Sequence, residues 1–162
     1  MTFSNDNSIH SLYDRKHGVV FGTLSKGTDL MDGLLRVAEK HQLQSGVVTC
    51  IGSLAYATYV HAKDDEHGNL FYSEPVVVNG PIEVLNGTGF LCRTENGGFD
   101  IHMHAVFVDK QGRPFGGHVL PGKNPTLVTI EFAIQVGEGI EAVRSYKPDL
   151  GFRTIHFRRK ED

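Results

Sequence analysis

The chain has 162 residues and a formal net charge of −3 with histidine neutral, a length that suits one domain with a sizeable core. Proteins that neutralise phosphates usually carry an excess of Lys and Arg, so this balance argues against autonomous nucleic-acid binding. No apolar run approaches the length of a membrane span, and we expect no membrane association.

Residues 1–16 are polar and lack the apolar segment of a secretory signal. Cys50 and Cys92 have no metal or redox spacing and are interpreted as buried free thiols. Both features predict a cytoplasmic protein. We expect a tail and lead-in over residues 1–17, a single domain over residues 18–157, and a charged C-terminal end over residues 158–162.

The first predicted elements are a strand over residues 17–24 and a helix over residues 28–43. Thr28 and Asp29 both suit the N-cap of this helix. Apolar residues recur along one side of it at helical spacing, namely Leu30, Leu34, Leu35 and Ala38. Such a helix is expected to cover a sheet.

The rest of the chain is rich in strand patterns separated by Gly, Pro and Asn. Further strands are expected over residues 46–51, 54–62, 70–72, 76–78, 82–91, 126–136 and 152–157. Residues 137–145 are predicted to hold a helical turn. Together these patterns predict an α+β domain, in which a largely antiparallel β-sheet packs with one main helix and short helical segments.

Residues 99–121 carry three histidines on a predicted β-hairpin. Side chains alternate between the two faces of a strand, so His102 and His104 share one face. The odd-numbered residues from 101 to 107 are apolar and pack behind them. This strand therefore presents two imidazoles side by side.

The turn of this hairpin decides where the third histidine lies. Centring the turn on Gln111 places His104 directly opposite His118, while a one-residue bulge at Gly112 would shift the pairing. Three convergent imidazoles suit Zn²⁺ or another divalent transition metal, and leave a position for water or substrate. The alternative is three polar residues on a solvated sheet face.

Two acidic residues are candidates for catalysis or for supporting the metal ligands. Glu131 lies in an apolar strand, where an unpaired carboxylate is costly, so we expect it to pair with a metal-bound histidine or with Arg144. A charge at a subunit surface is the alternative. Glu83 is the weaker candidate, because Pro81 indicates a strand edge or start, where acids are common.

Four residues are candidates for ligand binding. Gly116 and Gly117, next to His118, would let the backbone approach a ligand closely. Lys123 follows the hairpin and is a candidate for binding an anion. The alternative is that it is an ordinary surface lysine. Arg144 completes this set.

The order of these segments resembles the plant-and-prokaryote conserved (PPC) domain, from about Gly18 to Phe157. The resemblance is carried by Gly27–Leu30, Ile51–Leu54, Gly80, Glu83, His102–His104, Gly116–His118, Thr129–Glu131 and Arg144. It implies a compact antiparallel sheet flanked by helices, associating as a homotrimer. It also implies a link to DNA, because the family is best known from plant AT-hook nuclear proteins.

Two departures weaken the link to DNA. The Gly-Arg-Phe-Glu segment of the plant members is Gly80-Pro81-Ile82-Glu83 here, without its Arg and Phe. No AT-hook is present, and we interpret the superficially similar residues 111–114 as a turn. A more distant resemblance is to acetolactate decarboxylase, which holds zinc with His-x-His and a later His.

Three functions follow as hypotheses. The first is a trimeric, zinc-binding protein with a small-molecule pocket, acting as a lyase or hydrolase on an oxygen-rich metabolite. The second is a DNA-associated regulator. The third is a protein-interaction trimer without catalysis, in which the histidine face is incidental.

Overall fold

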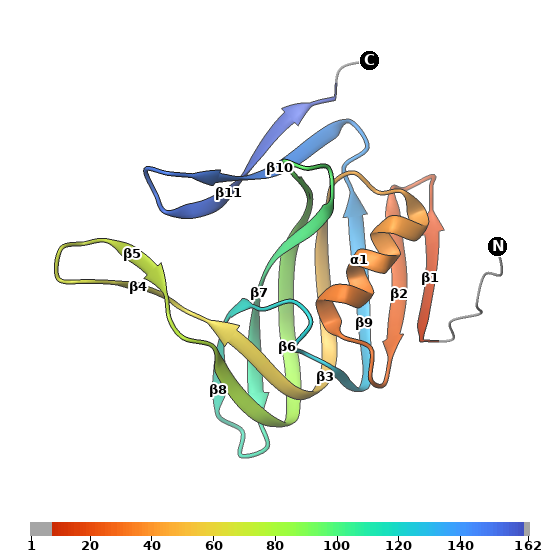
Figure 1. The fold of residues 1–162 in the computed structure, drawn as a ribbon. Helices are drawn as coiled ribbons and strands as arrows, with labels where there is room; N and C mark the ends of the chain where they lie inside the picture. The colour runs from red at the N-terminus through yellow and green to blue at the C-terminus, as the bar shows by residue number, and fades with distance from the viewer. Residues whose placement is uncertain (1–7, 161–162) are drawn as a thin grey trace.

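The computed structural model describes residues 8–160, which form eleven strands and one helix (Figure 1). In chain order these are β1 (Ile9–Asp14), β2 (Val19–Ser25), α1 (Leu30–His41), β3 (Gly46–Val60), β4 (Ala62–Asp64), β5 (Leu70–Tyr72), β6 (Val76–Thr94), β7 (Phe99–Asp109), β8 (Pro114–Val119), β9 (Thr126–Val136), β10 (Ile140–Lys147) and β11 (Phe152–Arg159). Nine strands form one sheet in the order β1-β2-β9-β3-β8-β7-β6-β10-β11, and β4 and β5 form a separate pair. The described pairings are antiparallel except that of β10 with β6. The architecture fits an α+β domain in broad terms.

Helix α1 covers one face of this sheet, as predicted (Figure 1). Asp29 is its N-cap, and the carboxylate accepts hydrogen bonds from the backbone N–H groups of Met31 and Asp32 at 3.0 and 3.1 Å. The buried side of α1 joins the core residues of the sheet, among them Leu24, Val48 and Ile134. No helix within residues 8–160 is long and apolar enough to cross a membrane.

Strands β3 and β6 are longer than the sequence predicts. Each joins two predicted strands into one, because the glycines between them form bulges rather than turns. The register of β3 shifts on both sides of Gly52, and its far end pairs with β8 through Val60 and His118. The sheet therefore curls, and brings β8 between β3 and β7.

Three predictions about secondary structure need correction. Residues 137–145 do not form a helical turn; strand β10 begins at Ile140 and pairs with β11 and β6. The expected lead-in contains strand β1, which pairs with β2. Short helical segments are not found in residues 8–160. Strand β10 also pairs with the distant end of β6, which a local pattern does not reveal. The tail predicted over residues 1–7 lies outside the described residues.

The sheet face opposite α1 carries large exposed apolar side chains. Directly paired residues share a face, and one row of such pairs crosses seven strands: Leu12, Phe21, Ala133, Thr49, Thr88, His104 and His118. Along this face Phe21 and Ile51 are 59% and 57% exposed. The histidine hairpin thus lies at one end of an uncovered apolar surface.

Candidate metal centre

The β7–β8 hairpin has the predicted register. Val108 pairs with Pro114 and His104 pairs with His118. Asp109 holds the turn, because its Oδ1 accepts the backbone N–H groups of Gln111 and Arg113 at 2.9 and 3.0 Å. Gly112 adopts a φ of 78°, a left-handed conformation that favours glycine. The turn residues thus fix which side chains face one another.

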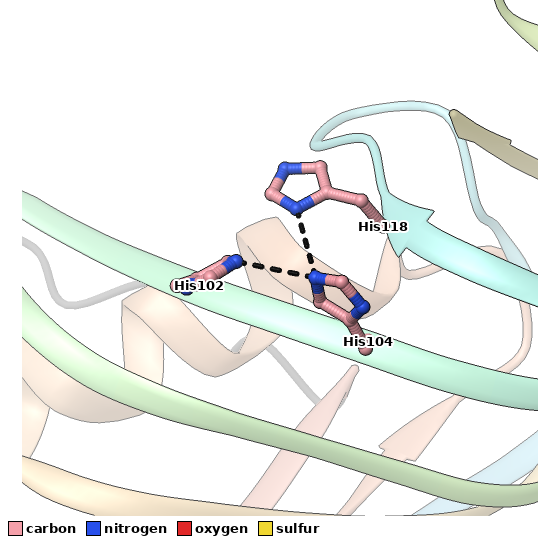
Figure 2. Close-up of side chains that lie close together, drawn as sticks. All are labelled: His102, His104 and His118. Atoms are coloured by element: carbon pink, nitrogen blue, oxygen red, sulfur yellow. Dashed lines mark hydrogen bonds between the residues drawn. The ribbon is translucent and has the colours of Figure 1, made fainter. Parts of the chain in front are cut away.

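Figure 2 shows the three imidazoles turned toward one another, two from β7 and one from β8. His104 Nε2 lies 3.2 Å from His102 Nε2 and 3.4 Å from His118 Nδ1. Two nitrogens bound to zinc at about 2.05 Å with a tetrahedral angle lie about 3.3 Å apart. One nitrogen from each ring lies within 4.8 Å of the other two. The two separations measured from His104 therefore match those around a tetrahedral ion, and the three rings are close enough together to share one ion.

Burial favours the neutral form of two of the three imidazoles, those of His118 and His102. It lowers the pKa of His118 to about 4, and the nearby positive charges of His102, Arg144 and His104 add to the effect. The pKa of His102 is also lowered, first by burial and then by Arg144 and His104. A neutral imidazole keeps a nitrogen lone pair for a metal. The rings of His102 and His118 are therefore able to bind a cation near neutral pH.

Aromatic rings and a groove surround the cluster. The ring of Tyr72, on β5, lies 5.1 Å from that of His118, and Phe152 of β11 lies 4.8 Å from Tyr72. Beside His104 is an open groove of about 510 Å³. Its lining includes Asn86, Thr88, Val106, Pro114, Gly116 and Gly117. The site thus has room for a small molecule.

Arg144 lies next to the cluster but has a different partner from the one predicted. Its Nη1 is 3.1 Å from Oδ2 of Asp100, so the expected pairing with Glu131 is wrong. Asp100 precedes His102 by two residues on β7 and shares its face. The alternation that groups the histidines places Asp100 beside them, but it does not indicate that Arg144, 44 residues away, is the partner of Asp100.

The two predicted acidic residues lie away from the histidines. Glu131 is exposed on β9 opposite Ile51, with β3 and β6 between it and β7. Its side chain lies on the uncovered sheet face, and the alternative of a charge at a subunit surface stays a prediction. Glu83 is exposed opposite Val108, four residues along β7 from His104 and therefore about 13 Å away. Any catalytic role of either residue would require a ligand that extends from the cluster.

Of the other candidates for ligand binding, two glycines lie in the groove beside His104 and Lys123 lies in the loop after β8. Gly116 and Gly117 line the groove, but glycine is needed at both positions because a side chain there would collide with neighbouring backbone. A Cβ at Gly116 would lie 2.1 Å from the carbonyl oxygen of Ala105, and one at Gly117 would lie 2.7 Å from that of Val60. Lys123 is exposed in the loop after β8, whose Asn124 donates its backbone N–H to the α1 cap. That loop belongs to the helix side of the sheet.

The chain belongs to a known family. Residues 12–138 match the Plants and Prokaryotes Conserved (PCC) domain, the family that the sequence resemblance indicates. The chain is 31% identical over 136 residues to the bifunctional protein GlmU of Synechococcus sp. (strain JA-3-3Ab), covering 82% of this chain. It spans only 19% of the length of that relative.

Two solved structures share the fold. One is a candidate DNA-binding protein from Bacteroides thetaiotaomicron, with a TM-score of 0.80 and 18% identity, covering 94% of this chain and 100% of that one. The other is a metal-containing protein from Archaeoglobus fulgidus, with a TM-score of 0.70 and 18% identity, covering 84% and 91%. At this identity the likeness establishes the fold alone.

The stability of the metal-free protein should depend on pH through His118 and His102. An unfolded histidine has a pKa of about 6.5, whereas folding lowers that of His118 to about 4. Between these values the unfolded state binds more protons, so the free energy of unfolding should fall as the pH drops through this window. Urea denaturation at stepped pH in a chelator measures the effect, and His118→Asn should reduce the slope. An NMR titration midpoint near pH 6.5 for His118 in the folded, metal-free protein would contradict the expectation.

Proposed function

We propose that this protein is a trimeric, cytoplasmic metal-binding protein that holds zinc with His102, His104 and His118. We further propose that it acts as a lyase or hydrolase on a small, oxygen-rich metabolite. The observation that carries the proposal is the spacing of the nitrogens, because His104 Nε2 lies 3.2 and 3.4 Å from a nitrogen of each of the other two rings, close to the separation expected around a tetrahedral ion. The free, buried Cys50 and Cys92 support a reducing compartment.

The arrangement fits catalytic rather than purely structural zinc. Three protein ligands leave one position for water or substrate. Zinc in such a site polarises a carbonyl, or lowers the pKa of its bound water to about 7. The groove beside His104 gives a small molecule access to this position. The metal-containing protein from Archaeoglobus fulgidus, which shares the fold, supports a metal-based function.

Protein purified without a histidine tag should contain close to one zinc ion per chain. His104→Ala should lower this content more than tenfold, since losing even a group that supports a ligand costs about 10–100-fold in affinity. His10→Ala is the control, because His10 is exposed on β1, far from the cluster. Elemental analysis of the three proteins makes the comparison. Equal metal content in wild type and His104→Ala, whether high or negligible, would contradict the proposal and leave the protein-interaction trimer as the better account.

The uncovered sheet face supports the trimer. Monomeric proteins rarely leave large contiguous apolar patches in water. Here Leu12, Phe21 and Ile51 are each more than half exposed, and Val106 is 49% exposed on β7. Because this face also carries His104, a neighbouring subunit packed on it would lie beside the histidine site.

Light scattering should give a mass three times that of the 17.9 kDa chain. Ile51→Glu places a charge in the middle of the apolar face and should shift the protein to monomers. Leu150→Glu is the matched control, because Leu150 is also exposed, at 48%, but lies in the β10–β11 loop. A monomeric wild type, or a trimer unaffected by Ile51→Glu, would contradict the trimer proposal.

A DNA-associated function is the second candidate. It is favoured by the fold shared with the candidate DNA-binding protein from Bacteroides thetaiotaomicron. The net charge of −3 opposes it, because phosphate binding normally requires an excess of cations. We expect the protein to pass through a DNA column at low salt. Retention that is lost steeply as salt is added would instead favour the DNA-associated function.

A further inference from the structure

The pairing of Arg144 with Asp100 places a guanidinium beside the histidine cluster. Strand β10 runs parallel to the end of β6, with Arg144 opposite Thr94, so the side chain extends toward β7. There its Nη1 contacts Asp100, which shares a face with His102 and His104. Asp100 is two residues from His102 on β7, so the guanidinium lies beside the histidine cluster.

This buried guanidinium has spare hydrogen-bonding capacity. Arg144 is only 9% exposed, and its Nε has no hydrogen-bond partner in residues 8–160. Within the same residues the Asp100 contact is the one hydrogen bond found for the whole guanidinium, which has five N–H donors. A buried donor without a partner is costly. The arrangement is therefore incomplete without a further acceptor.

The charges around the site identify the acceptor as an anion. Imidazole ligands contribute no negative charge to a metal site, and Asp100 balances Arg144, so a bound zinc ion would leave about two positive charges uncompensated. A carboxylate matches the fork of a guanidinium in two parallel hydrogen bonds. The rings of Tyr72 and Phe152 line the side of the site next to His118.

We infer that the ligand of this site is a small carboxylic acid whose carboxylate pairs with Arg144 while a neighbouring oxygen occupies the open position on the metal. This inference rests on the proposed zinc site and narrows its substrate to acids with a hydroxyl or carbonyl oxygen next to the carboxylate. Arg144 is then a binding residue that selects the ligand, separate from the three residues that hold the ion.

The test compares ligands on zinc-loaded protein, with binding followed by NMR titration. Glycolate has the carboxylate and the neighbouring hydroxyl, whereas ethylene glycol has two hydroxyls at the same spacing and no charge. Glycolate should bind and ethylene glycol should not. Inorganic phosphate is the third probe, and tighter binding of phosphate than of glycolate would overturn the carboxylate assignment.

Two variants separate this inference from the zinc proposal. Arg144→Gln should weaken glycolate binding at least tenfold while zinc content stays near that of wild type. Arg144→Lys keeps the charge but not the two-pronged donor, so it should fold normally and lose part of the affinity. Equal glycolate binding by wild type and both variants, or no glycolate binding by zinc-loaded wild type, would overturn the inference and leave the zinc site standing. Wild-type protein that takes up no zinc would overturn both.

Discussion

The pairing of His104 with His118 across the β7–β8 hairpin is the constraint on which the candidate site depends. A slip of one residue would turn His118 to the opposite face of the sheet, because side chains alternate along a strand. Asp109 opposes such a slip by accepting two backbone N–H groups of the turn and by binding Arg113. The geometry of the metal site is therefore set by a turn several residues away from it.

The position of the site in the sheet connects the metal proposal with the trimer proposal. A row of directly paired residues runs from Leu12 on β1 to His118 on β8, all on the face that α1 does not cover. The apolar residues of this face and the histidines thus lie on the same side of the sheet. Two other hairpins also contribute side chains next to the histidines: β4–β5 supplies Tyr72, and β10–β11 supplies Phe152 and Arg144. Chain segments far apart in the sequence therefore meet at the histidine site.

The structural features that could be predicted from the sequence are those that depend on residues close together in the chain. The histidine hairpin is predictable because alternation and a single turn fix its register, and helix α1 is predictable because capping and apolar spacing lie within one segment. Strand β10 is not, since it is stabilised by β11 and by the distant end of β6. The partner of Arg144 escapes prediction for the same reason: Asp100 is 44 residues away. Glu131 has an apolar pattern around it because its neighbours face the core, while its own side chain faces outward.

Zinc K-edge X-ray absorption of the purified protein tests the central claim most directly, because it reports the atoms bound to the metal. The account predicts three imidazole nitrogens at about 2.0–2.1 Å and one further light atom. A spectrum dominated by sulfur, or one without the scattering of imidazole rings, would contradict it.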